Sequence, residues 1–262
     1  TFEKLKELNK SALIPFITAG DPSPTETVSL MNTLVENGAD MIELGIPFSD
    51  PMADGPVIQR ASERALKNKV GIKDTIKLAK DFRKKNKETP LILMGYANPI
   101  EAIGVENFIS LIKEAQIDGV ITVDYPPEES KEFVKKLNKE KIDSIFLISP
   151  TTEDERIKLI AKQASGFLYY VSLKGVTGAA NIDIEQVSKN VKNIQKYSEL
   201  PVAVGFGVRD PKTAKAVSEI SDGVVIGSRI VREIEESDEI EIISNVKKLM
   251  HSMKTAIDSS SV

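Results

Sequence analysis

The sequence contains no cysteine, which excludes disulfides, thiolate nucleophiles and metal sites built from cysteine. Its only histidine is His251, far from the strand ends described below, so a histidine-rich metal site is excluded as well. No apolar run reaches the roughly 20 residues that cross a bilayer, and no secretory signal pattern is present. We therefore expect a cytoplasmic protein that has no membrane partner.

The chain also lacks an excess of positive charge. Lysine and arginine number 35 against 39 aspartates and glutamates, for a formal net charge of -4, and the two signs are mixed along the sequence. A nucleic-acid-binding protein would show a basic face, so we expect no nucleic-acid partner. With 262 residues, 41% of them hydrophobic, the chain is long enough for one sizeable core.

Short apolar runs alternate with longer amphipathic stretches from end to end. The runs mostly do not alternate with polar residues, which is typical of strands buried on both faces of a parallel sheet. The expected strands are Ala12–Thr18, Met41–Phe48, Leu91–Tyr96, Gly119–Tyr125, Asp143–Ser149, Phe167–Leu173, Val202–Gly207 and Val224–Gly227. Amphipathic helices are predicted over Thr25–Asn37 and Glu239–Ile257, and prolines suit the first turns of helices at Pro24, Pro127 and Pro211.

A weak internal repeat supports the same interpretation. The segments NGADMIELG, QIDGVITVDY and ISDGVVIGS share a helix end, a small residue and then a strand. About eight such units in a chain of this length predict an α/β fold, a (β/α)8 TIM barrel with extra helices, as a single domain over residues 1–262. A doubly wound open sheet is the alternative, but no GxGxxG turn follows an early strand.

The second predicted strand brings Glu43 to the barrel mouth, where the active sites of such barrels lie. A carboxyl group between Ile42 and Leu44 would be partly desolvated, which raises its pKa and lets it both donate and accept a proton. A glutamate paired with a lysine for structure is the alternative.

The loop after this strand carries Asp50 and Asp54 between three prolines, Pro47, Pro51 and Pro56. The prolines restrict the backbone. Both aspartates could simply shape turns, because Asp-Pro and Asp-Gly are common turn sequences. They could also hold Mg²⁺ through water, although nothing in the sequence requires a metal.

The last three strands deliver a tyrosine pair and several glycines. Strand six carries Tyr169 and Tyr170 and runs into the loop Ser172–Gly178, which could close over a substrate or be an ordinary surface loop. Strands seven and eight end in Gly205–Gly207 and Gly227–Ser228, where backbone N–H groups and the start of a short helix, Arg229–Glu233, favour a phosphate site. Tight turns would explain the glycines equally well.

Two further polar residues have simple alternatives. Asp124 ends strand four and is either a site residue or the start of an Asx turn before Pro126. His251 lies among lysines of the last helix, where we expect it to be solvated.

Four segments together resemble the tryptophan synthase alpha subunit family. They are PFITAGDP (Pro15–Pro22), IELGIPFSDPMADGPVIQ (Ile42–Gln59), GVTG (Gly175–Gly178) and GFGV (Gly205–Val208). The second segment is long and specific, and the resemblance covers nearly the whole chain.

This resemblance implies a retro-aldol reaction, the cleavage of indole-3-glycerol phosphate to indole and glyceraldehyde 3-phosphate. The family's catalytic residues match Glu43, as the acid and base, and Asp54, as the carboxylate that stabilises the protonated indole ring. Substrate-binding positions of the family match Phe16, Ile58, Tyr96, Tyr169, Thr177 and Phe206. Its phosphate-binding positions match Gly178, Gly207, Gly227 and Ser228, and it implies no metal.

The resemblance also implies a partner, the tryptophan synthase beta subunit, in an alpha2beta2 heterotetramer. Pyridoxal phosphate belongs to that subunit, so the alpha chain is expected to hold no cofactor, and indole passes between the two. The loop after strand two faces the partner in the family, which makes Pro47, Asp50 and Pro51 interface candidates. The chain departs from some relatives at Leu173 and Lys174, and at Val123 and Tyr125, which concerns the lid and partner contacts.

Two alternatives to this function stay open at the level of sequence. Lys174 stands where some barrel aldolases place a Schiff-base lysine, but a lysine in a glycine-bearing loop is expected to be protonated and a poor nucleophile. The chain could also act without catalysis, as an activator of the beta subunit or as a phosphate-ligand-binding module. Retention of both Glu43 and Asp54 favours an enzyme, because ligand binding alone does not require an acid in the strand.

Overall fold

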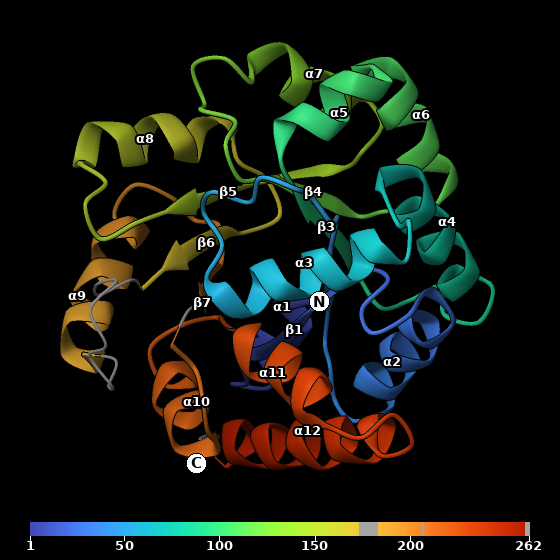
Figure 1. Cartoon of the computed structure of the whole chain (residues 1–262). Helices are drawn as coiled ribbons and strands as arrows, with labels where there is room; N and C mark the ends of the chain where they lie inside the picture. Colours follow the sequence, from blue (N-terminus) through green and yellow to red (C-terminus); the bar gives the residue numbers. More distant parts are fainter. Residues whose placement is uncertain (173–182, 206, 260–262) are drawn as a thin grey trace.

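Eight parallel strands close into a barrel in the computed structural model, which describes residues 1–172, 183–205 and 207–259 (Figure 1). Each strand pairs with the next along the chain, and β8 pairs with β1. The strands are β1 Ala12–Thr18, β2 Ile42–Gly45, β3 Leu91–Gly95, β4 Gly119–Thr122, β5 Asp143–Ile148, β6 Leu168–Val171, β7 Val202–Gly205 and β8 Gly223–Ile226. The predicted barrel is confirmed, and the open sheet is excluded.

Helices surround the ring of strands (Figure 1). They are α1 Phe2–Glu7, α2 Pro24–Glu36, α3 Pro56–Lys67, α4 Ile72–Arg83, α5 Ala97–Ile103, α6 Val105–Glu114, α7 Lys131–Lys139, α8 Asp154–Gln163, α9 Ile184–Gln195, α10 Pro211–Ser218, α11 Ser228–Glu236 and α12 Ile242–Asp258. Several βα connections hold two helices, so the extra helices are also confirmed. No helix in the described ranges is long and apolar enough to cross a membrane.

The observed strands are shorter than the sequence suggests. The predicted strand Met41–Phe48 pairs only over Ile42–Gly45, because Pro47 has no N–H to continue the ladder. Pro24 and Pro211 are the first residues of helices, as predicted. Pro127 lies in a turn before α7, so the prediction that it lies in the first turn of a helix was wrong. The helix after Gly227 is longer than the predicted Arg229–Glu233 and ends at Glu236.

The repeated segments have a shared structural role that their sequence did not disclose. In each, an aspartate just before an even-numbered strand accepts a hydrogen bond from the N–H at the start of the preceding strand. Asp40, Asp118 and Asp222 bind the N–H groups of Leu13, Leu91 and Val202, each at 2.8 Å. Each bond links two neighbouring βα units at the amino-terminal end of the barrel.

The two ends of the barrel are covered differently. The inner apolar cluster includes Ile14, Ile92, Ile121 and Tyr169. Helix α1 closes the amino-terminal end of the strands, where Phe2 packs on Phe167 with ring centroids 5.6 Å apart. The opposite end is partly covered by α3 and α11, which lie side by side over β1 (Figure 1). The carboxyl ends of the strands, where the candidate residues lie, therefore face a partly roofed opening.

Candidate active site

Glu43 lies in the middle of β2, with its Cα paired to Phe16 on one side and Ile92 on the other. Both neighbours belong to inward-facing clusters, so the glutamate also points into the barrel. Its exposed fraction is 0%, and neither carboxylate oxygen has a hydrogen-bond partner among the described residues. Burial raises the pKa of Glu43 to about 8, so the carboxyl group is mostly protonated at neutral pH. No lysine of the described residues pairs with Glu43, so they give no support to the alternative of a glutamate held by a lysine for structure.

Tyr169 lies on β6 within the inner cluster and shares this space with Glu43. Burial raises the pKa of Tyr169 well above its ordinary value, and the nearby negative charges of Glu43 and Asp54 raise it further. Gly205 on β7 makes room for the ring, because a Cβ there would lie 2.3 Å from the Tyr169 hydroxyl oxygen. Tyr169 therefore stays a neutral phenol beside the two carboxyl groups.

Asp54 reaches the opening from the loop between β2 and α3. Its Oδ2 accepts a hydrogen bond from the Tyr96 hydroxyl at 3.1 Å, and the same hydroxyl accepts one from Ala53 N at 3.1 Å. The side chain of Gln59 binds the Asp54 carbonyl oxygen at 2.8 Å, which fixes the loop to the first turn of α3. Burial raises the pKa of Asp54 to about 6, while the Tyr96 hydrogen bond opposes the rise.

The two carboxyl groups thus have separated proton affinities. At pH 7, Glu43 with a pKa of about 8 is mostly a neutral acid, and Asp54 with a pKa of about 6 is mostly a carboxylate. Two titratable groups whose environments push their pKa values apart are the usual basis of an acid and base pair. The arrangement can donate a proton from one side of a substrate and accept a hydrogen bond on another.

An apolar sleeve lies beside these groups. Phe16 packs with Val57 of α3 and Val231 of α11, and Ile58 packs against this cluster. Tyr96 lies beside Phe48, with ring centroids 5.3 Å apart. These residues form the kind of aromatic and aliphatic wall that surrounds a flat ligand.

Three further residues that pack against the inner cluster were not assigned to the site from the sequence. Met94, Val123 and Leu147 are half-buried and pack against the inner cluster. Each comes two residues after an inward-facing isoleucine, namely Ile92, Ile121 and Ile145. The period of two along a strand was therefore the signal that could have found them.

The phosphate candidates that the structure describes lie at the ends of neighbouring strands. Gly207 follows β7 with a positive φ of 86°, a conformation that favours glycine. Gly227 caps α11, and the exposed Ser228 is its first residue. Because β7 and β8 pair side by side, these backbone N–H groups lie at one edge of the opening.

Five predicted positions lie outside the described residues. They are Leu173, Lys174, Thr177 and Gly178 in the loop after β6, and Phe206 after β7. Their roles stay predictions.

Other candidates occupy different surroundings. Asp124 is exposed, and its Oδ1 accepts a hydrogen bond from Ala97 N at 2.7 Å, at the start of α5, so it orders a neighbouring loop. His251 is exposed on α12, as expected. Within the described part of the chain, no group of three histidine, aspartate or glutamate side chains is arranged to hold a metal ion.

The interface candidates differ in exposure. Pro47 is buried, Pro51 is half-buried, and Asp50 is exposed with its carboxylate bound to the Ser49 hydroxyl. An open groove of about 760 Å³ lies between this loop and α3, lined in part by Phe48, Asp50, Pro51, Met52 and Glu63. Met52 is a large apolar side chain that is 78% exposed beside it.

Comparison with known proteins identifies one family. A family model described as tryptophan synthase alpha chain matches residues 2–258. Proteins named tryptophan synthase alpha chain from Nitrosomonas europaea and Thiobacillus denitrificans are 54% and 56% identical. The first alignment covers 99% of this chain and 94% of the relative, and the second covers 100% and 96%.

Solved structures agree with this match. Tryptophan synthase subunit alpha from Legionella pneumophila superposes with a TM-score of 0.91 at 45% identity, covering 98% of this chain and 97% of the other. A chain of Mycobacterium tuberculosis tryptophan synthase has a TM-score of 0.88 at 31% identity, covering 98% and 96%.

Proposed function

The chain belongs to the tryptophan synthase alpha chain family, and from that premise we propose how its barrel carries out the family's reaction. The enzyme is a lyase of tryptophan biosynthesis that cleaves indole-3-glycerol phosphate to indole and glyceraldehyde 3-phosphate. The observation that carries the proposed mechanism is the fully buried carboxyl group of Glu43, which has no hydrogen-bond partner among the residues that the structure describes.

Glu43 is the proton donor and acceptor of the reaction. Indole is a poor leaving group until its ring carbon C3 is protonated, and a neutral Glu43, with a pKa of about 8, can supply that proton. The resulting carboxylate then takes the proton of the glycerol hydroxyl next to the breaking carbon–carbon bond. The bond electrons neutralise the protonated ring, the hydroxyl carbon becomes the aldehyde, and Glu43 is again protonated.

Asp54 stabilises the charge that develops on the ring. As a carboxylate it accepts a hydrogen bond from the indole N–H, an interaction that strengthens when C3 is protonated. The hydrogen bond from Tyr96 holds its Oδ2 in place before the substrate arrives. Its contribution therefore belongs to the transition state, so its removal is expected to lower kcat more than it raises KM.

The remaining site residues bind the two ends of the substrate. Phe16, Ile58, Tyr96 and Tyr169 enclose the indole, and Met94 extends the same wall. The phosphate binds the backbone N–H groups at Gly207, Gly227 and Ser228, since a helix N-terminus attracts anions. Thr177, Gly178 and Phe206 complete the site in the family and keep that assignment here.

The partner is the beta subunit of tryptophan synthase, in an alpha2beta2 heterotetramer of the cytoplasm. Pyridoxal phosphate is held by that subunit. This chain, a single domain over residues 1–262, needs no cofactor because Glu43 carries both proton transfers and Asp54 stabilises the charge on the ring. The groove beside Asp50 and Pro51, with the exposed Met52 at its edge, supports this loop as a contact surface. Pro47 is buried, so its role there is to shape the loop.

Steady-state cleavage of indole-3-glycerol phosphate by Glu43→Gln and Asp54→Asn tests the mechanism. Loss of one oxyanion-type or proton-transfer group costs about 100-fold to 1000-fold in kcat, and we expect losses of that order for both variants. The assay is run on the isolated chain and again with a beta subunit, where the native chain is expected to be faster. Full activity of Glu43→Gln in the complex would overturn its assignment.

A further inference from the structure

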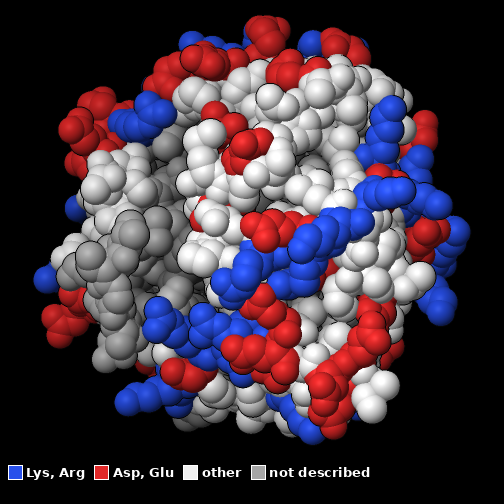
Figure 2. All heavy atoms as spheres, viewed as in Figure 1, with Lys and Arg blue, Asp and Glu red and all other residues white. Residues whose placement is uncertain are grey.

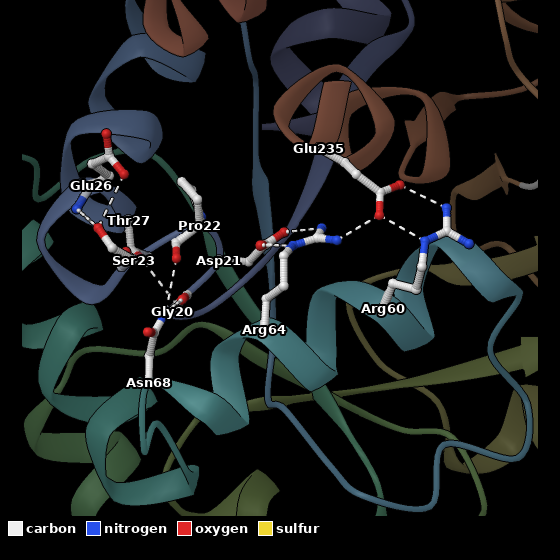
Figure 3. Close-up of polar contacts among 10 residues, drawn as sticks. All are labelled: Gly20, Asp21, Pro22, Ser23, Glu26, Thr27, Arg60, Arg64, Asn68 and Glu235. Carbon is white, nitrogen blue, oxygen red and sulfur yellow. Dashed lines mark hydrogen bonds and ion pairs between the residues drawn. The ribbon is translucent and has the colours of Figure 1, made fainter. Parts of the chain in front are cut away.

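Four side chains of alternating charge form a network on the outer side of α3 and α11, the helices that partly cover the barrel opening. This network lies away from the groove. Arg64 binds both carboxylate oxygens of Asp21, at 2.6 and 2.9 Å, and also Glu235 Oε1 at 2.6 Å. Arg60 binds both oxygens of the same Glu235 at 2.7 Å. Figure 3 shows the two arginines, one turn apart on α3, reaching toward Glu235 of α11, with Asp21 on the far side of Arg64.

Arg64 is the central member of this network. It joins three segments that border the opening: α3, the loop after β1 that holds Asp21, and α11. Asp21 is 1% exposed and Arg64 is 27% exposed, whereas Arg60 is 48% exposed. The Asp21–Arg64 pair is therefore the most buried link, whose loss would leave a buried charge unpaired, and the Arg60 pair is the most exposed.

The segment that receives Arg64 is itself ordered. Gly20, with a φ of 87°, donates its N–H to the Thr27 hydroxyl at 2.9 Å, and its carbonyl accepts from the Asn68 side chain at 3.0 Å. Asn68 also binds the carbonyl oxygen of Pro22 at 2.8 Å. The carboxylate of Asp21 is therefore a fixed anchor, to which Arg64 attaches the carboxyl-terminal part of α3 (Figure 3).

We propose that Arg64 is a positioning residue for the cleavage reaction. It holds α3 at a fixed angle, so that Asp54, just before the amino end of α3, keeps a fixed distance from Ser228 at the start of α11. This proposal rests on the proposed catalytic role of Asp54. Arg64 lies about 12 Å along the helix from Pro56, since a helix rises 1.5 Å per residue. A tilt of about 2.5° around that attachment moves the amino end by roughly 0.5 Å. Since a misplacement of about 1 Å costs about 100-fold in rate, half of that displacement costs about tenfold.

The carboxyl-terminal half of α3 combines a small buried side chain with polar attachments. Its apolar contacts to α11 and β1, through Val57 and Ala61, lie in the first half of the helix, and Ala65 is the buried apolar side chain of its second half. Arg64 and Arg60 attach α3 to α11 through hydrogen bonds to Glu235. Figure 2 shows basic and acidic side chains next to each other over these two helices. We therefore expect loss of Arg64 to loosen the angle of α3 without unfolding the barrel.

A double-mutant cycle between Arg64→Gln and Asp54→Asn tests the proposal. The values of kcat and KM for indole-3-glycerol phosphate are measured for the native chain, the two single variants and the double variant. Single-turnover assays are used where activity is low. We expect Arg64→Gln alone to lower kcat about tenfold and to change KM less than about threefold, with Arg64→Lys intermediate. In the Asp54→Asn background the same change should have less than about a twofold effect, because it acts through Asp54. Asp21→Asn should reproduce the tenfold loss.

Arg83→Gln is the matched control, because Arg83 is a buried arginine paired with Asp118 at 2.6 Å at the other end of the barrel. It should lower the unfolding temperature and leave kcat unchanged. Native kcat in Arg64→Gln, or an equal loss in both Asp54 backgrounds, would overturn the positioning role. If Arg64→Gln does not fold, Glu235→Gln, which removes only the α11 attachment, takes its place in the cycle with the same expected pattern. Native kcat in Asp54→Asn would instead refute the assignment of Asp54 itself.

Discussion

Replacement of Glu43 by glutamine should stabilise the protein, by an amount that grows with pH. The folded-state pKa of Glu43 is about 8, against an ordinary value of 4.5. The folded protein therefore binds this proton more tightly than the unfolded chain does, and ionisation opposes folding. The resulting cost is absent below pH 4.5, rises between pH 4.5 and 8, and is complete above pH 8.

The magnitude follows from the two pKa values. One pKa unit corresponds to about 1.4 kcal/mol, so Glu43 destabilises the fold by about 3 kcal/mol at pH 7 and about 5 kcal/mol above pH 8. Glutamine has nearly the same shape and no charge, so Glu43→Gln should recover these amounts. At pH 5 the difference between the two proteins should be smaller by at least about 2 kcal/mol than at pH 7.

Thermal unfolding of both proteins at pH 5, 7 and 9 measures the effect. For a chain of 262 residues, about 3 kcal/mol corresponds to a rise of roughly 5 °C in Tm at pH 7. Glu88→Gln, at an exposed glutamate in the turn before β3, provides the control and should show no such trend. A difference between Glu43→Gln and the native protein that stays constant from pH 5 to 9 would refute the claim that burial keeps this carboxyl group neutral.

Three further changes test neighbouring contacts. Tyr96→Phe removes the hydroxyl 3.1 Å from Asp54 Oδ2, so the pKa of Asp54 should rise above about 6 and the acidic limb of the kcat profile should move to higher pH; an unmoved limb would speak against this contact. Gly205→Ala places a methyl group 2.3 Å from the Tyr169 hydroxyl oxygen, and such overpacking should cost about 1–3 kcal/mol in denaturant unfolding together with activity; native values of both would show that the ring can move. Asp222→Ala leaves a strand N–H unpaired, which should cost about 1–3 kcal/mol of stability with kcat unchanged; a large loss of kcat would mean that this end of the barrel affects the site.

Much of the candidate site could be predicted because it is encoded locally. Glu43 stands within an apolar run, and Asp54 follows it in a proline-rich loop, so one βα unit supplies both carboxyl groups. Gly227 and Ser228 precede a helix, whose start is also a local signal. Such features depend on residues close in sequence, and the closed barrel then brings the strand ends together.

Other features depend on contacts between distant parts of the chain. The sequence suggested partial desolvation of Glu43, whereas its complete burial results from the packing of β1, β2, β3 and β6. The attachment of Arg64 to Asp21 and Glu235 joins residues 43 and 171 positions apart. No periodicity in the chain encodes these pairs, since each charge alone is typical of a solvated helix face.

The sequence by itself therefore determined the barrel, the order of its strands and the two carboxyl groups, because strand burial and loop chemistry are written in short-range patterns. Only the tertiary structure decided the proton affinities of Glu43 and Asp54, which differ because one side chain is sealed inside the barrel and the other receives a hydrogen bond from Tyr96. It also decided that the repeated aspartates clamp strands and that Arg64 ties α3 to its neighbours. Burial and long-range pairing arise only when the barrel closes, and they set the chemistry that the sequence pattern made available.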